Sequence, residues 1–254
     1  MSALLAIDTS TQLCSAAILL HDEIVEEVVD ISRGHTQHIL PLIDRLLSAC
    51  GITLNTLDAI ALTAGPGSFT GLRIGMGVAQ GLAFGADLPV VPVSTLQTLA
   101  QGAIRTKGAE REQWILPMLD ARMGDVYWGL YNREAEISDD GITQPISREL
   151  IPDQVNQPVA VLENLNQMLK QMLPSGIDGV EQLALALGVG DGWRFGNELG
   201  FKVKVFDTDA RSVARDIIPL ALEKLSAGKL TDPSALEPFY IRDKIHWQKR
   251  KRLR

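Results

Sequence analysis

Two aspartates stand at matching places in the chain, and each carboxylate could hold a divalent cation. Asp8 follows a short apolar run and precedes Thr9 and Ser10, whose hydroxyls could contact a phosphate. Asp120 follows a second apolar run in the same way, 112 residues later. Carboxylate oxygens are preferred ligands of Mg²⁺. The alternative is that both aspartates only end their strands in turns, and for the isolated protein we favour this alternative.

The histidines give a weaker metal signal. His35 and His38 are three residues apart, so two imidazoles could meet on a zinc or iron ion. No cysteine or carboxylate stands near them in the sequence, and an apolar stripe begins at His38. An ordinary helix N-terminus with Thr36 as its cap is therefore favoured. His21 and His246 are isolated, and the chain has no Gly-x-Ser-x-Gly segment of the kind that carries a hydrolase serine.

Glycines concentrate in residues 65–85. Five of them fall inside an expected helix over 68–85, where each costs roughly 1 kcal/mol relative to alanine. Small residues recur every four positions and form two ridges on the expected helix. One ridge consists of Gly67, Gly71, Gly75 and Ala79, and the other of Gly77, Gly81 and Gly85. Ridges of bare backbone let another helix approach closely. We favour such packing, within the core or across a subunit interface, over a phosphate-binding loop at 65–71.

A shorter glycine-rich segment, Gly188–Gly192, follows another apolar run. It resembles a turn that contacts a nucleotide. Because it is short and no clear helical pattern follows it, a tight loop is the favoured interpretation.

The order of the expected elements indicates an α/β protein whose halves repeat. The first half predicts a meander of three strands, then helix, strand, helix, strand and helix, over residues 4–8, 13–20, 23–31, 38–50, 57–64, 68–85, 89–93 and 94–104. The second half repeats this less clearly, with strands at 115–119, 125–131, 183–189 and 202–206 and a helix at 210–227. Four prolines in this half are interpreted as marking loops: Pro145, Pro152, Pro158 and Pro174.

Two facing βββαβαβα halves describe the two-lobed actin-like, Hsp70-like and sugar-kinase (ASKHA) fold. We expect an N-terminal lobe over 1–108 and a C-terminal lobe with a basic tail over 109–254. In that fold the first hairpin of each half grips nucleotide phosphates. The usual glycine of that hairpin is Thr9 here, so Asp8, Thr9 and Ser10 are predicted to form a degenerate phosphate loop.

Composition and charge limit the class of protein. Hydrophobic residues make up 46% of the chain and charged residues 22%, as in ordinary globular domains. No apolar run approaches the length of a membrane span, and Asp8 interrupts any early signal peptide. Two cysteines, Cys14 and Cys50, suit a reducing compartment, so a cytoplasmic location is expected.

The charge is unevenly distributed along the chain. The net charge is −7, yet residues 244–254 carry six cations and no carboxylate. An acidic body repels nucleic acid, whereas this tail could contact RNA or an acidic partner. A solvated chain end is the favoured alternative for the tail.

Six segments together resemble one family closely and keep its motif order. They are Leu5–Ser10, His35–Pro41, Gly65–Gly75, Asp120–Trp128, Gly188–Trp193 and Pro238–Arg242. The chain resembles the bacterial TsaB (YeaZ) family, which takes part in making threonylcarbamoyladenosine (t6A) in tRNA. The resemblance spans nearly the whole chain and matches no motif over 138–177.

The resemblance implies a non-catalytic subunit. The catalytic relative TsaD carries two metal-binding histidines, spaced H-x-x-x-H, in the helix after the strand that follows its glycine helix. Those two places fall on Thr95 and Leu99 in this chain. Leucine offers no lone pair and a threonine hydroxyl is a weak ligand, so neither replaces an imidazole. The chain is therefore expected to have no metal site and no catalytic residue of its own.

The same resemblance implies partners: a TsaD-type catalytic paralogue, a TsaE-type ATPase, and tRNA through the complex. We expect an interface on the helix over 37–49 and on the glycine helix, comprising His38, Leu42, Leu46, Gly71, Gly75, Gly77, Gly81 and Gly85. Alone, the chain is expected to form a homodimer through this apolar surface. ATP or ADP with Mg²⁺ at the complex interface is left open. The alternatives are a metallo-glycoprotease-like hydrolase and a small-molecule kinase of the sugar-kinase type.

Overall fold

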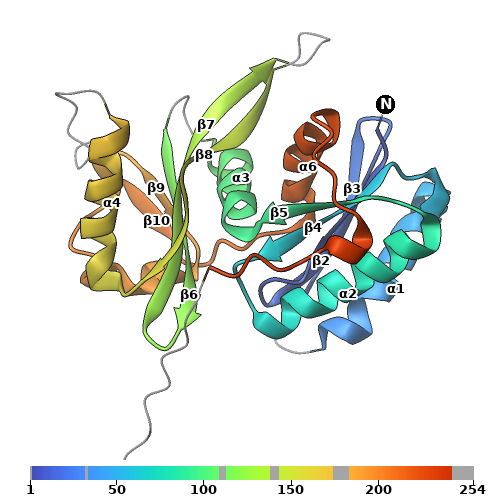
Figure 1. The fold of residues 1–254 in the computed structure, drawn as a ribbon, viewed down its shortest axis with the longest axis horizontal. Helices are drawn as coiled ribbons and strands as arrows, with labels where there is room; N and C mark the ends of the chain where they lie inside the picture. Colours follow the sequence, from blue (N-terminus) through green and yellow to red (C-terminus); the bar gives the residue numbers. More distant parts are fainter. Residues whose placement is uncertain (1, 32–33, 109–112, 138–142, 174–182, 242–254) are drawn as a thin grey trace, which may run out of the picture.

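The computed structural model describes residues 2–31, 34–108, 113–137, 143–173 and 183–241. Within them lie two five-stranded sheets, which stand side by side (Figure 1). The first sheet contains β1 (Leu4–Asp8), β2 (Leu13–Leu20), β3 (Glu23–Asp30), β4 (Ala59–Gly65) and β5 (Val90–Ser94). The second contains β6 (Trp114–Arg122), β7 (Asp125–Ile137), β8 (Thr143–Asn156), β9 (Leu187–Val189) and β10 (Val205–Asp207).

The two sheets share one topology. The spatial order of the first is β3-β2-β1-β4-β5, and that of the second is β8-β7-β6-β9-β10. In each sheet the first three strands pair antiparallel and the last two add parallel to the first strand. The predicted α/β fold with duplicated halves is therefore confirmed.

Five α-helices cover these sheets in the described part of the chain: α1 (His35–Cys50), α2 (Phe69–Ala86), α3 (Thr95–Lys107), α4 (Pro158–Met172) and α6 (Ile217–Ser226). Short 3₁₀ segments are η1 (Leu54–Thr56), η2 (Asp191–Glu198), η3 (Ala214–Asp216) and η4 (Pro233–Ala235). Both α1 and α2 cover one face of the first sheet, and their apolar stripes join one core cluster with β1, β2 and β4. On the opposite face of that sheet lies α6.

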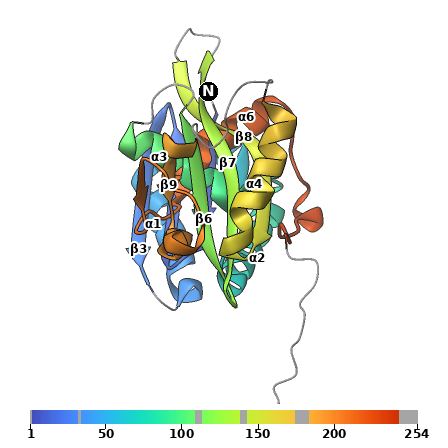
Figure 2. The ribbon, with the colours of Figure 1, turned by 90° about the vertical axis from the view of Figure 1, so that its left-hand side faces the viewer.

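The two sheets are joined by helices that lie between them. Helix α3 follows β5 of the first sheet but packs its apolar side chains against β6 and β9 of the second. Helix α6 follows β10 of the second sheet but packs on β1, β4 and β5 of the first. Figure 1 shows both helices between the sheets, and Figure 2 shows α4 on the outer side of the second sheet. The predicted division at residue 108 stays a prediction.

Several elements of the second half differ from the expectation. Pro145 and Pro152 lie within β8, and Pro158 is the first residue of α4. The prediction of loops at these three prolines is therefore wrong. Because β8 is an edge strand, it tolerates residues that cannot donate to a neighbouring strand. Proline at the first helical position removes an N–H that has no partner there. Pro174 lies outside the described residues.

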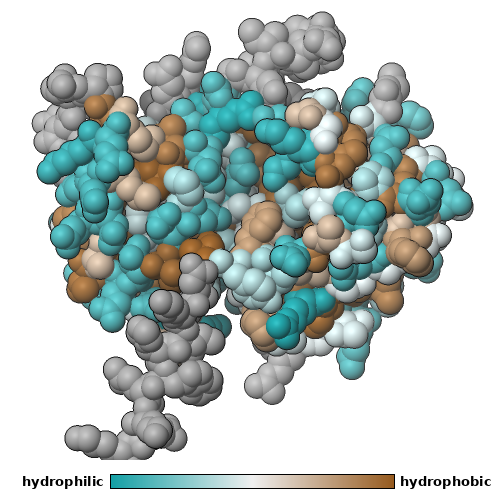
Figure 3. All heavy atoms as spheres, viewed as in Figure 1, coloured by the Kyte–Doolittle hydropathy of each residue, from teal (hydrophilic) through white to brown (hydrophobic). Residues whose placement is uncertain are grey.

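The helix expected over 210–227 is shorter. It begins with η3 and continues as α6 to Ser226. None of the helices in the described ranges is long and apolar enough to cross a membrane. Hydrophilic side chains cover most of the face in Figure 3, and the apolar patches on it are small and scattered.

Candidate functional site

The turn between β1 and β2 holds a buried polar network around Asp8. The backbone N–H and the hydroxyl of Ser10 both donate to Asp8 Oδ1, at 2.8 and 2.6 Å. Thr63 at the end of β4 donates to the same oxygen at 2.8 Å. The Ser10 hydroxyl also lies 3.2 Å from that of Ser212. Asp8 Oδ2 is buried and has no hydrogen-bond partner among the described residues.

The N-terminal half of α2 closes this turn. Thr9 donates its hydroxyl to the Gly71 carbonyl at 2.8 Å, and the Ser68 N–H donates to the Ser10 carbonyl at 2.7 Å. A Cβ atom at Gly71 would overlap the Thr9 carbonyl, and one at Gly75 would overlap the Thr9 hydroxyl. The ridge that includes Gly71 and Gly75 therefore allows α2 to touch the turn. The ridge packs against this turn. The sequence had predicted that a second helix would pack there.

The structure brings Asp8, Thr9 and Ser10 together but occupies their polar groups. Thr9 and Ser10 are buried, and each hydroxyl already donates within the chain. A phosphate loop needs donors that face a ligand. The degenerate phosphate loop stays a prediction, and in this conformation the Thr9 and Ser10 hydroxyls are engaged internally.

The second ridge of α2 faces outward. Gly77, Gly81 and Gly85 are exposed, and no heavy atom of the described residues lies within 4 Å of a Cβ atom built on any of them. Phe84, between two of these glycines, is 84% exposed. The predicted interface therefore keeps Gly77, Gly81 and Gly85 as residues that a partner can reach.

Helix α1 contributes less to the predicted interface than expected. Leu42 and Leu46 are buried in the core beneath the first sheet, so their side chains are not available to a partner. Gly71 and Gly75 are buried in the same chain, which corrects the prediction for all four residues. His38 is half-buried. The spacing of the apolar residues indicates which face of α1 is buried. In the structure, that face packs on the first sheet.

The N-terminal end of α1 also differs from the prediction. Gly34, in the left-handed region at φ 100°, precedes the first residue of the helix, so Thr36 is not the cap. The buried ring of His35 lies 2.9 Å from the Thr11 carbonyl, which ties α1 to the β1–β2 turn. At the other end, Gly51 adopts φ 66° and its N–H caps the helix, as expected.

Thr95 and Leu99 lie on the inner side of α3. Both are buried, and Leu99 belongs to the apolar cluster that α3 shares with β6 and β9. The Thr95 hydroxyl has no hydrogen-bond partner among the described residues. In the same part of the chain, no group of three or more His, Cys, Asp and Glu side chains is arranged to hold a metal ion. His246 lies outside the described residues, and the absence of a metal site stays a prediction.

Asp120 and the glycine turn of the second half lie together. Asp191 accepts a hydrogen bond from the Asp120 N–H at 3.0 Å, and Asp120 accepts one from the Arg122 N–H at 2.7 Å. Gly190 has φ 104°, and the 3₁₀ segment η2 begins directly after it. A short helical segment therefore follows the turn, contrary to the expected loop without a helix.

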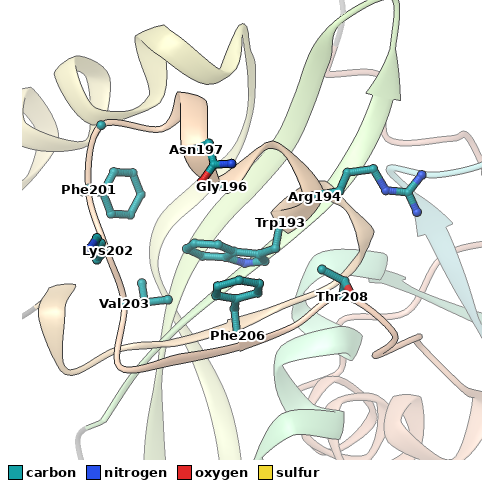
Figure 4. Close-up of a pocket in the computed structure, with 10 residues that line it drawn as sticks. Trp193, Arg194, Gly196, Asn197, Phe201, Lys202, Val203, Phe206 and Thr208 are labelled. Carbon is teal, nitrogen blue, oxygen red and sulfur yellow. The ribbon is translucent and has the colours of Figure 1, made fainter.

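A pocket that the sequence did not indicate lies beside η2 and β10. It encloses about 540 Å³. The Trp193 indole stacks on Phe206 at 5.6 Å between centroids and meets Phe201 edge-on at 6.2 Å (Figure 4). Its N–H donates to the Leu116 carbonyl at 3.0 Å. Figure 4 shows the Arg194 side chain extending away from the three rings, so the inside of the pocket is mainly apolar.

A buried carboxylate joins the two sheets. Asp153 of β8 accepts hydrogen bonds from the Tyr131 hydroxyl at 2.5 Å and from the Ser94 hydroxyl at 2.6 Å. Ser94 ends β5 and caps α3. Burial raises the pKa of Asp153 to about 6, although both hydrogen bonds act in the opposite direction. Sequence patterns could not reveal this group, because Tyr131 and Asp153 lie on paired strands of the second sheet whereas Ser94 comes from β5 of the first.

Comparisons with known proteins match a TsaD family model and relatives named TsaB. The family model of TsaD, tRNA N6-adenosine threonylcarbamoyltransferase, matches residues 26–190. The tRNA threonylcarbamoyladenosine biosynthesis protein TsaB of Escherichia coli is 38% identical over 250 residues, which cover 97% of both chains. That of Haemophilus influenzae is 37% identical over 246 residues, covering 97% of this chain and 96% of the relative.

Solved structures extend this agreement to the fold. YeaZ from Pseudomonas aeruginosa superposes with a TM-score of 0.77 at 33% identity, covering 94% of this chain and all of the other. A further P. aeruginosa structure, described as similar to peptidase YeaZ, gives 0.80 at 34% identity over 95% of this chain. The chain therefore belongs to the TsaB family of tRNA threonylcarbamoyladenosine biosynthesis proteins.

Proposed function

We propose that this chain is a non-catalytic subunit for threonylcarbamoyladenosine synthesis, which binds a TsaD-type transferase through the outer face of α2. The outward ridge of Gly77, Gly81 and Gly85 carries this proposal. Each of these glycines weakens an exposed helix by roughly 1 kcal/mol relative to alanine. Nothing within the described chain packs on them to offset that cost. A helix of another subunit that approaches the bare ridge would offset it.

Exposed apolar side chains on α2 and on the adjacent helix α1 support the same surface. Phe84 on α2 is 84% exposed and Leu40 on α1 is 49% exposed. Large apolar side chains lose contact with water when a partner covers them, which stabilises a complex. In the absence of the transferase, a second copy of the chain would cover the same face, so the isolated protein is proposed to form a homodimer.

The catalytic chemistry is assigned to the partner. Thr95 and Leu99 stand where the resemblance places histidines in the transferase, and both are buried in this chain. A TsaE-type ATPase and tRNA complete the proposed assembly. The hydroxyls of Thr9 and Ser10 do not fit a nucleotide phosphate in this conformation, because both are used inside the chain. We therefore assign no step to a nucleotide bound by this subunit.

Gly81→Leu tests the proposal. The substitution adds a bulky side chain where the proposed partner helix lies closest, so it should abolish co-purification with the transferase and reduce homodimer formation. The monomer should stay folded, because the position is open. Cells that depend on this variant should lose threonylcarbamoyladenosine from tRNA, as measured by mass spectrometry of digested tRNA.

Gln167→Leu is the matched control. Gln167 is exposed on α4, at the other side of the molecule, so this variant adds a similar apolar side chain away from α2. It should bind the transferase like the wild type. If Gly81→Leu retains full transferase binding and full tRNA modification, the outer face of α2 is not the interface and the proposal is refuted.

A further inference from the structure

The pocket beside η2 has a fixed aromatic floor. The Trp193 N–H donates to the Leu116 carbonyl at 3.0 Å, and the indole stacks on the Phe206 ring. Gly188 of β9 lies against the indole, and a Cβ atom at this position would overlap it. A glycine there lets the indole pack directly on the strand. The floor is therefore formed before any ligand binds, as it is in most small-molecule sites.

Apolar side chains continue the wall of the pocket from this floor. Phe201 meets the indole edge-on, and Val203 lines the same space. Figure 4 shows these side chains with Phe206 beside the Trp193 indole. Phe206 is 55% exposed, so a ligand that covers its ring removes apolar surface from water. The volume of about 540 Å³ lies within the usual range of small-molecule pockets and can hold a ligand with two fused rings.

Three polar side chains also line the pocket: Asn197, Lys202 and Thr208. Among the described residues, none of the three uses its side chain in a hydrogen bond or an ion pair. No acidic residue is among the described residues that line the pocket. The other cation of the lining, Arg194, extends away from the rings (Figure 4). One ammonium group, one amide and one hydroxyl therefore remain for a ligand that carries a single negative charge.

We propose that this pocket binds a small aromatic carboxylate. Its ring would lie against Phe201, Val203 and Phe206, and its carboxylate would be balanced by the Lys202 ammonium. A nucleotide fits the lining less well, because phosphate sites combine several cations or the N–H groups of a helix N-terminus. The pocket lies beside the second sheet, whereas α2 covers the first. The inference therefore does not depend on the interface proposed for the transferase.

Isothermal titration calorimetry of the full-length chain with two matched probes tests this inference. The wild type should bind indole-3-acetate with a Kd below about 1 mM, and should bind the uncharged indole-3-acetamide more weakly. Lys202→Met should weaken acetate binding by about 3-fold or more and leave amide binding unchanged. Lys204→Met is the matched control, because Lys204 is exposed two residues away and does not line the pocket. It should bind both probes like the wild type.

Gly196→Leu tests the location of the site. A Cβ atom at Gly196 would have one described heavy-atom neighbour within 4 Å, Cε3 of Trp193 at 4.0 Å. A leucine can therefore extend over the indole and fill the pocket without displacing its surroundings. Binding of both probes should be lost, while capture of the transferase should be unchanged. Thermal unfolding verifies that the variant is folded, and the two lysine variants test the inference independently of it.

Four results would overturn the inference. In the first, indole-3-acetate does not bind the wild type at millimolar concentration. In the second, the acetate and the amide bind equally well, or Lys202→Met and Lys204→Met weaken acetate binding to the same extent. In the third, a folded Gly196→Leu variant binds indole-3-acetate as tightly as the wild type. In the fourth, AMP binds more tightly than indole-3-acetate, which assigns the pocket to a nucleotide.

Discussion

The hydroxyl of Thr9 donates a hydrogen bond to the carbonyl of Gly71, 2.8 Å away, and a Cβ atom at Gly71 would overlap the Thr9 carbonyl. The two residues lie 62 positions apart in the chain. Their contact seals the β1–β2 turn against α2 and explains why one ridge of that helix is free of side chains. The opposite ridge has no such neighbour within the described residues.

Gly71→Ala and Gly81→Ala should therefore change stability in opposite directions. The first forces a methyl group against the Thr9 backbone and should lower the free energy of unfolding by about 1–3 kcal/mol. The second improves helix propensity at an open position and should raise it by up to about 1 kcal/mol. Urea unfolding at a protein concentration low enough to dissociate the proposed homodimer measures both. Equal effects of the two substitutions would contradict the assignment of inner and outer ridges.

Asp153 should make the free energy of unfolding fall as the pH rises, because its buried carboxyl group favours the protonated form. Its pKa is about 6 in the folded protein, against an ordinary value of 3.8. The folded state therefore holds a proton more tightly than the unfolded state. The resulting stabilisation is complete below 3.8 and is lost as the pH rises through about 6. The difference corresponds to about 3 kcal/mol.

Asp153→Asn should remove this dependence. The amide keeps an acceptor for one of the Ser94 and Tyr131 hydroxyls, and the other hydroxyl can rotate to accept from the amide nitrogen. Relative to the wild type, the variant should gain stability as the pH rises through about 6. Urea unfolding over a pH series measures the difference. A difference between the two proteins that is constant with pH would contradict the burial argument.

Cys14 should be unreactive in the folded protein. Burial and the nearby Asp8 carboxylate raise the pKa of its thiol to about 11, so little thiolate forms at neutral pH. Iodoacetamide labelling followed by mass spectrometry should modify Cys14 only after unfolding. Cys50 is half-buried at the end of α1 and serves as the internal comparison. Rapid labelling of Cys14 under native conditions would show that the β1–β2 region opens.

Local patterns predicted the first half of the fold well. The apolar stripe of α1, its end at Gly51 and the strand that ends at Asp8 all depend on neighbouring residues, and the structure has them as expected. In the second half, β8 and α4 were missed because prolines were interpreted as loops. An edge strand and a first helical turn accept proline, and only the topology reveals which strand is at an edge.

The sequence identified residues of the candidate site but not which way each of them faces in the fold. The four-residue spacing identified two glycine ridges, yet only the position of Thr9 shows that Gly71 and Gly75 point inward. Leu42 and Leu46 share a face, and the pattern alone does not say whether a sheet or a partner covers it. Ser212, which joins the network around Asp8, comes from the far end of the chain, and no local signal marks it.

The isolated chain should bind no stoichiometric transition metal and transfer no threonylcarbamoyl group. A Lewis-acid site needs at least three protein ligands, and Leu99 offers no lone pair at the place where the resemblance puts a histidine. Elemental analysis of the purified protein tests the first part, with the histidine-bearing transferase prepared in parallel as a positive control. An assay with tRNA and the threonylcarbamoyl adenylate tests the second. One zinc or iron per chain, or turnover without a partner, would show that this subunit is itself a catalyst or metal carrier.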